Sequence, residues 1–303
     1  MGALNNTLVG LIGLMPRPVM RHFATRYIAG ETIDEALTRL RALNADGYSG
    51  VLDILGEDAE GETGARRALG EYVTALDALD ASGLEAYVSA KPTHFGLRTS
   101  EDLCHELYDS LARACAEVGR FLRVEMEDHT TTDATLRIFE RLLADHDNVG
   151  VVLQSRLKRN DDDVERLLAV CPDGRTLDVR MVKGIYLEPA ELAHTEPGPI
   201  ADAFVRQSRR LFEGGARVCL ATHDEVMAER LFAEVRALDV PRERYELQVL
   251  MGVRRFLWTQ WLDAGHPVRV YVPYGPEWRP YSLRRLKKNP KLMAQFAKGV
   301  FGR

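Results

Sequence analysis

The stretch from residue 149 to residue 182 reads VGVVLQSRLKRNDDDVERLLAVCPDGRTLDVRMV and contains one strand–helix–strand unit. Its two ends, 149–154 and 177–182, are short runs of β-branched and aliphatic residues, which are typical of buried strands. Between them, four residues recur at the spacing of one helix face: Val164, Leu167, Leu168 and Cys171. The acids at 161–163 suit a helix N-terminus. This order of elements predicts two parallel strands joined by a helix.

The same pattern recurs along most of the chain. Eight short apolar runs alternate with helical stretches: Ser49–Leu55, Leu84–Ala90, Phe121–Met126, Val149–Gln154, Leu177–Val182, Arg217–Ala221, Tyr245–Leu250 and Pro267–Tyr271. Eight strands of this kind close naturally into a barrel, so we expect an α/β fold of the (βα)8 TIM type. The alternative is an open doubly wound sheet, but the G-x-G-x-x-G fingerprint expected after its first strand is absent from the sequence.

The length of 303 residues suits a single catalytic domain. Residues 1–45 are predicted to form an N-terminal helical segment, in which Thr32 and Glu35 make a capping box. Residues 46–303 then hold the barrel and a final helix, which we expect over the C-terminal face of the barrel.

Two further boundaries follow from local signals. Thr99 and Asp102 form a capping pair that predicts the start of a helix. The stretch Pro189–Pro199 is predicted to be one long loop after the fifth strand. Long loops at this position often cover a barrel's active site.

Composition excludes several classes of protein. A formal net charge of −5 and a pI near 6 argue against nucleic-acid binding. The apolar run Leu8–Met15 is too short to span a bilayer, so neither a signal peptide nor a transmembrane helix is predicted. The cysteines show no CxxC pair or metal-like spacing and are expected to be reduced, buried thiols of a cytoplasmic protein: Cys104, Cys115, Cys171 and Cys219.

Polar residues gather where the predicted strands end, and in a barrel of this type these ends face the active site. The set comprises Lys91, Glu125, Glu127, Asp128, His129, Gln154, Arg180, Lys183, Tyr186, Thr222, His223, Glu246, Gln248 and Tyr271. Arg180 and Glu246 stand inside apolar strands, where an unpaired charge costs several kcal/mol, so each needs a partner or a ligand. An internal salt-bridge network is the alternative explanation for either residue.

The last predicted helix carries Tyr281, Arg284 and Arg285 at spacings that place the phenol beside both guanidinium groups. Two arginines suit a carboxylate or a phosphate, so this group is a candidate anion clamp. A solvated basic face that continues through Lys287 and Lys288 is the alternative. No metal site is predicted, because the sequence has no HExxH motif and His223 stands apart from metal-like spacing.

Seven segments in order make the chain resemble the FAD-dependent proline dehydrogenase family in its short, monofunctional form. They are S-A-K-P at 89–92, R-V-E-M-E-D-H-T at 123–130, V-V-L-Q at 151–154, R-M-V-K-G-I-Y at 180–186, A-T-H-D at 221–224, Y-E-L-Q-V-L-M-G at 245–252 and Y-S-L-R-R at 281–285. The R-x-V-K-G-x-Y and Y-x-x-R-R motifs are the specific ones.

The resemblance implies oxidation of L-proline to Δ1-pyrroline-5-carboxylate, the first step of its degradation to glutamate, with FAD as hydride acceptor and a membrane quinone as electron acceptor. It leaves peripheral contact with the inner face of the membrane open. Glu125 and Arg180 would be catalytic. Substrate binding would fall to Lys91, Tyr186, Tyr271, Tyr281, Arg284 and Arg285. FAD would contact Met126, Gln154, Arg180, Lys183, Gly184, Ile185, Thr222 and His223.

Three positions depart from the family pattern. Glu125 stands where the family usually has Asp, Ile185 stands where it usually has Ala, and Lys288 stands where better-known members have an acid that pairs with the clamp. Two other functions stay open from the residues alone. A Schiff-base aldolase would use Lys91 or Lys183 as its nucleophile, and a binding barrel would need no catalytic residue at all.

Overall fold

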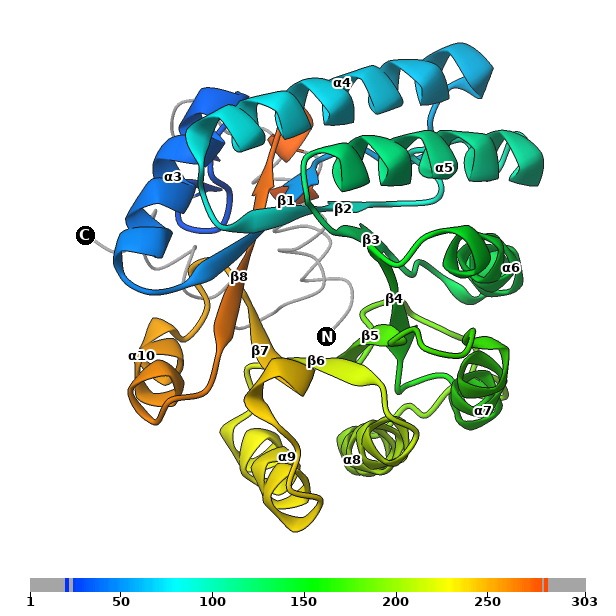
Figure 1. Cartoon of the computed structure of the whole chain (residues 1–303), viewed down its shortest axis with the longest axis vertical. Coiled ribbons are helices and arrows are strands. Elements are labelled where there is room, and N and C mark those ends of the chain that lie inside the picture. The colour runs from blue at the N-terminus through cyan, green and yellow to red at the C-terminus, as the bar shows by residue number, and fades with distance from the viewer. Residues whose placement is uncertain (1–19, 22–23, 280, 283–303) are drawn as a thin grey trace, which may run out of the picture.

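The computed structural model describes residues 20–21, 24–279 and 281–282, and its centre is a closed barrel of eight parallel strands (Figure 1). The strands are β1 (Ser49–Ile54), β2 (Ala86–Ala90), β3 (Leu122–Val124), β4 (Val149–Gln154), β5 (Asp178–Val182), β6 (Arg217–Ala221), β7 (Tyr245–Leu250) and β8 (Val268–Tyr274). Each strand pairs with the next in sequence, and β8 pairs with β1. The predicted (βα)8 barrel is therefore confirmed.

Helices surround the barrel, as Figure 1 shows. They are α3 (Ile33–Ala45), α4 (Gly61–Ser82), α5 (Glu101–Glu117), α6 (His129–Asp145), α7 (Asn160–Val170), α8 (Pro197–Glu213), α9 (Glu225–Ala237) and α10 (Arg255–Asp263), with a 3-10 turn at Arg242–Arg244. From α4 to α10, one helix follows each of the strands β1 to β7. Their apolar faces pack on strands that are buried along almost their whole length.

The strand predictions differ from the structure mainly at the third and eighth strands. Strand β3 ends at Val124, so Glu125 and Met126 lie in the loop that follows it. Strand β8 runs three residues further than predicted, to Tyr274. The predicted bounds of the fourth, sixth and seventh strands agree with the structure.

Helix starts follow the capping chemistry, with two corrections. The backbone N–H of Glu35 donates to Thr32 Oγ1 at 3.3 Å, so the predicted capping box at the start of α3 is confirmed. The prediction of Thr99 as a cap is wrong, because Ser100 Oγ accepts from the N–H of Leu103 and starts α5 one residue later. The loop after β5 is shorter than predicted, since Pro197 begins α8, where the missing N–H of proline costs no hydrogen bond.

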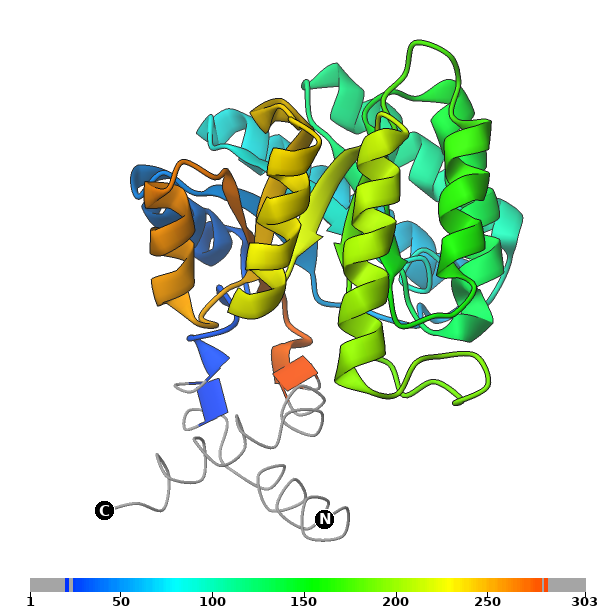
Figure 2. The same cartoon turned by 90° about the horizontal axis from the view of Figure 1, so that it is seen from below.

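The segments before α3 and after β8 meet beyond the end of the barrel where the strands terminate (Figure 2). The N–H of Ala29 donates to Pro273 O at 2.9 Å, and the N–H of Gly275 donates to Gly30 O at 3.0 Å. A small apolar cluster joins the segments to the loop after β1: Met20, Ala24, Ile28, Leu55 and Trp278. This cluster lies beside the barrel end that carries the polar strand-end residues.

All four cysteines are free thiols; three are buried, and Cys171 is only partly buried. In the described ranges, no helix has both the length and the apolar character needed to cross a membrane.

Candidate active site

Two ion pairs occupy the C-terminal end of the barrel. In the first, Lys91 Nζ lies 3.1 Å from both carboxylate oxygens of Asp53. Asp53 comes from β1 and is fully buried, and burial raises the pKa of its carboxyl group to about 6 even though Lys91 opposes the shift. The carboxylates of Asp53 and Glu125 outweigh the burial of Lys91 and raise the pKa of its ammonium. This lysine is therefore held in its charged form.

In the second pair, Arg180 Nη1 from β5 donates to Glu125 Oε1 at 2.5 Å. The hydroxyl of Ser89 donates to the same oxygen. Burial alone would raise the pKa of Glu125, but Arg180, the Ser89 hydrogen bond and Lys91 together lower it. The expectation that Arg180 has a specific partner is confirmed, and the longer side chain of Glu125 reaches that partner.

The guanidinium group of Arg180 is enclosed on several sides. Its Cζ lies 5.4 Å from the centre of the Tyr271 ring, and its Nη2 lies 3.4 Å from the hydroxyl of Tyr87. Its Nε is buried and has no hydrogen-bond acceptor in the part of the chain that the structure describes. A buried N–H without an acceptor is costly, so this atom is a candidate contact for a bound ligand.

The loop after β5 carries three of the residues predicted to contact a cofactor. Gly184 has a φ of +90°, and a Cβ at this position would lie 2.8 Å from Gln154 Oε1, so a glycine is needed there. Lys183 Nζ donates to Asp224 Oδ2 at 2.7 Å, and Ile185 is exposed. Gln154 itself, at the end of β4, donates from Nε2 to the carbonyl oxygen of Glu127 at 2.6 Å.

The loop after β6 lies next to that after β5. Thr222 Oγ1 accepts the backbone N–H of Asp224 at 3.0 Å, and His223 Nε2 accepts the backbone N–H of Leu250 at 2.9 Å. Both residues thus help to shape the backbone at the ends of β6 and β7. Asp224, which the sequence analysis did not single out, caps α9 and pairs with Lys183.

Two polar residues after β3 have local structural roles. The carboxylate of Glu127 accepts the N–H of Thr93 at 2.9 Å and its hydroxyl at 2.8 Å, which fixes the loop that follows Lys91. Asp128 is the N-cap of α6 and accepts the N–H of Thr130.

Tyr281 lies beside the small apolar cluster. The pKa of the Tyr271 phenol is raised mainly by burial and by the carboxylates of Asp53 and Glu125, and to a smaller extent by Tyr281. Tyr281 and Tyr271 therefore lie at the same end of the barrel. The remaining members of the predicted clamp, Arg284 and Arg285, and the departing Lys288, lie outside the described residues.

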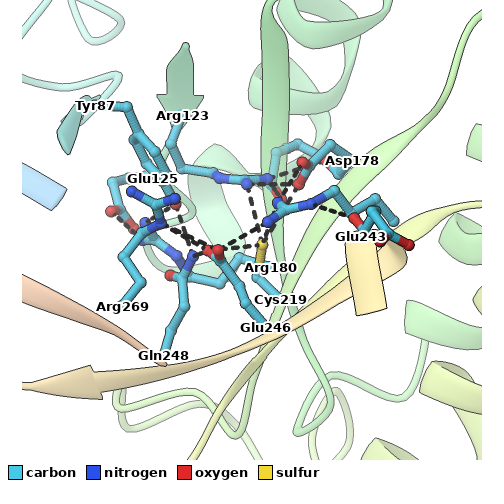
Figure 3. A network of polar contacts seen from close by, with 12 residues as sticks. Tyr87, Arg123, Glu125, Asp178, Arg180, Cys219, Glu243, Glu246, Gln248 and Arg269 are labelled. Carbon is cyan, nitrogen blue, oxygen red and sulfur yellow. Dashed lines mark hydrogen bonds and ion pairs between the residues drawn. The ribbon is translucent and has the colours of Figure 1, made fainter. Parts of the chain in front are cut away.

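Glu246 does not belong to this end of the barrel, so its inclusion among the strand-end residues was wrong. It is the second residue of β7 and lies inside the barrel next to Arg269 and Gln248 (Figure 3). It accepts hydrogen bonds from Arg217 at 2.7 Å and Arg269 at 2.9 Å. Burial would raise its pKa, but the two arginines lower it to about 2. The alternative of an internal salt-bridge network is correct for this residue.

The sequence analysis missed Asp53, and it included Ser89 only as the first residue of the S-A-K-P segment, without a role. Asp53 had a usable signal, because it is an acid inside the apolar run S-G-V-L-D-I-L at 49–55. As for Arg180, a charge inside an apolar strand is costly without a partner, so Asp53 should have been recognised as a paired residue. Ser89 had no such signal, since a small hydroxyl residue is unremarkable in a strand.

Comparison with known proteins gives one consistent family. The sequence profile described as "Proline dehydrogenase" matches residues 36–298. Proline dehydrogenase of Deinococcus radiodurans is 33% identical over 291 residues, covering 94% of this chain and 92% of that protein. Proline dehydrogenase 1 of Bacillus subtilis (strain 168) is 29% identical over 280 residues, covering 91% and 90% of the two chains.

A solved structure shares the fold. Proline utilization A from Bdellovibrio bacteriovorus, inactivated by N-propargylglycine, superimposes with a TM-score of 0.84 at 22% identity. The match covers 92% of this chain but 34% of the other, so this chain spans about a third of that longer protein. With a profile match over most of its length and a relative of similar size at 33% identity, this chain belongs to the proline dehydrogenase family.

Proposed function

We propose that this protein is a flavoenzyme that oxidises L-proline to Δ1-pyrroline-5-carboxylate, with FAD as hydride acceptor and a membrane quinone as the final electron acceptor. Membership of the proline dehydrogenase family supports the substrate. The proposal rests on two ion pairs at the C-terminal end of the barrel, where barrel enzymes hold their substrates. Lys91 pairs with Asp53, and Arg180 pairs with Glu125.

The substrate's strongest handle is its carboxylate, which needs a fixed cation. Lys91 supplies an ammonium group that is kept charged and is oriented by Asp53. Arg284 and Arg285 would add forked donors to the same carboxylate. The ring of proline would lie among Tyr186, Tyr271 and Tyr281.

The chain's residues also fit a flavin. FAD, when bound, supplies the hydride acceptor. Arg180 Nε is a buried donor without an acceptor among the described residues, and Gly184 lets the backbone take a φ of +90°, which other residues rarely adopt. The remaining contacts would come from Met126, Lys183, Ile185, Thr222 and His223. The positive charge of Arg180 would stabilise negative charge that develops on a reduced flavin.

The residues argue against the aldolase alternative. A Schiff base requires a neutral lysine amine as nucleophile. Lys91 is paired with Asp53, and the surrounding carboxylates raise the pKa of its ammonium. Lys183, the other candidate, donates to Asp224.

The visible spectrum of the purified protein, reconstituted with FAD, tests the proposal. We expect flavin absorption bands that bleach when L-proline is added without oxygen and return when a soluble quinone analogue follows. Lys91→Met is the matched control, because it should keep the bands and need far more proline to bleach them. A protein that binds no FAD, or whose flavin bands are unaffected by proline, would refute the proposal. Reoxidation by quinone-containing vesicles then tests the membrane acceptor.

A further inference from the structure

We propose that Tyr87, itself held by Gln248 and Glu246, is a positioning residue that fixes the guanidinium plane of Arg180 toward the flavin. The inference rests on the proposed function, because Arg180 is assigned there to the flavin. Tyr87 lies on β2, and its side chain points into the barrel together with those of Arg123, Arg269 and Gln248 (Figure 3).

The ring of Tyr87 is held by packing that does not involve its hydroxyl group. Arg269 Cζ lies 4.6 Å from the ring centre and Arg123 Cζ lies 5.8 Å from it, both as cation–π contacts. Phe121 meets the ring edge-on, with 5.3 Å between ring centres. The ring and its neighbours therefore set where the hydroxyl oxygen lies, whereas the hydrogen bond from Gln248 sets how its hydrogen and lone pairs are directed.

A chain of hydrogen bonds ends on that hydroxyl group. Gln248 Nε2 donates to the Tyr87 oxygen at 2.7 Å and to Glu246 Oε1 at 2.6 Å. Glu246 is held in turn by Arg217 and Arg269, and these arginines keep it ionised. A carboxylate fixed by several charged donors is a rigid anchor, so the amide of Gln248 has one favoured orientation.

Arg180 depends on this anchor for its second fixed point. Its Nη1 donates to Glu125, and its Nη2 reaches the Tyr87 oxygen at 3.4 Å. With the hydrogen bond to Glu125 alone, the guanidinium group could pivot about that bond. The second contact, to Tyr87, fixes the plane of the guanidinium group and therefore the direction of the Nε–H bond. Two buried polar atoms, Arg180 Nε and Gln248 Oε1, have no partner in the described ranges. The chain thus holds a donor that is available for a bound group.

The variant must distinguish a role of the Tyr87 hydroxyl in positioning Arg180 from a role in stability alone. Tyr87→Phe keeps the ring and its cation–π contacts and removes only the hydroxyl group. Tyr108→Phe is the matched control: Tyr108 on α5 is fully buried, and its hydroxyl donates to the backbone oxygen of Ala90 on β2 at 2.6 Å and not to the Arg180 side chain. Each variant loses one buried hydrogen-bonding group, so a purely structural loss affects both alike.

The experiment measures the midpoint potential of bound FAD, kcat and KM for proline, and the unfolding midpoint of each protein. In Tyr87→Phe we expect the two-electron potential to fall by about 30 mV, the equivalent of a tenfold change in the reduction equilibrium. We expect kcat to fall by roughly tenfold, with KM within about twofold of wild type, because an interaction at the flavin acts on the chemical step. Tyr108→Phe should leave the potential unchanged.

Equal potentials and equal kcat values in Tyr87→Phe and Tyr108→Phe would overturn the inference. Gln248→Met cuts the chain one step earlier and should lower the potential in the same direction, so the inference stays testable if Tyr87→Phe does not fold. An unchanged potential in Gln248→Met would equally overturn it. Failure of the proposed function looks different, because wild-type protein itself would then bind no FAD or show no bleaching with proline.

Discussion

Replacing Glu246 by Gln should destabilise the barrel from within, and the structure allows the size of the effect to be worked out. Glu246 lies on β7 and accepts hydrogen bonds from Arg217 and Arg269. Both arginines remain in Glu246→Gln, where Asp178 is left as the acid that pairs with Arg217 and with the fully buried Arg123. Arg123 and Arg217 would then share the carboxylate of Asp178, and Arg269 would keep only the exposed Glu85 as an acidic partner.

Two independent estimates of the loss agree. Removing one charge from a buried ion pair typically costs about 3–5 kcal/mol. The pKa of Glu246, lowered from 4.5 to about 2, corresponds to about 3 kcal/mol of stabilisation of the ionised form. Unfolding entropy scales with chain length, so for 303 residues a loss of 3–5 kcal/mol lowers Tm by about 5–8 °C.

Thermal and urea unfolding at pH 7 measure this loss, with Glu165→Gln as the control. Glu165 pairs with Arg210 on the surface, where both side chains are largely exposed, and such a pair contributes less than about 1 kcal/mol. The contribution of Glu246 is fully present above pH 4.5 and declines as the pH falls toward 2, so the difference between wild type and Glu246→Gln should shrink in that range. A Glu246→Gln protein no less stable than Glu165→Gln would refute the reasoning.

Three further outcomes are expected. Asp53→Asn removes the closest counter-ion of Lys91, so burial should lower the pKa of the lysine ammonium. KM for proline should then rise roughly tenfold at alkaline pH, which a pH profile of KM measures. Gly184→Ala forces a side chain into a φ of +90°, and FAD titration should show affinity weaker by roughly tenfold. Arg285→Met should raise KM for proline by roughly 10- to 100-fold while flavin absorbance shows unchanged FAD content.

The fold was predictable from the sequence because the strands are buried on both faces. In such strands the apolar run and the strand coincide, and the fourth, sixth and seventh strands were bounded correctly for this reason. The third strand was predicted too long, because Met126 extends the apolar pattern past Val124, where the strand ends. Apolar character marks burial, and hydrogen bonding between strands is a separate property.

The sequence showed that a buried charge needs a partner, but it did not show which residue that partner is. A charge inside an apolar strand requires compensation, and this rule found Arg180 without its partner. Glu125 and Arg180 are 55 positions apart, and the contact depends on the closure of the barrel. The depth of a residue also depends on its place along the strand: Glu246 and Gln248 point to the same side, but two residues of rise, about 6.6 Å, separate an internal ion pair from the layer beneath the site.

The barrel interior is lined with charged side chains, and these bear on what its open end binds. Interiors of such barrels are usually filled by branched aliphatic residues. Here four arginines, Arg123, Arg180, Arg217 and Arg269, pair with three carboxylates inside the barrel, those of Glu125, Asp178 and Glu246. Burial raises the pKa of Cys219 to about 12, so its thiol adds no negative charge. The pair of Lys91 and Asp53 adds no net charge. Arg269 also pairs with Glu85 at 3.5 Å, so each of the four arginines has an acidic partner. Their N–H donors are held in fixed orientations, and fixed donors favour negative charge at the barrel end. A proline carboxylate and a reduced flavin are both anions, so the polar interior supports the proposed chemistry in a way that an aliphatic interior would not.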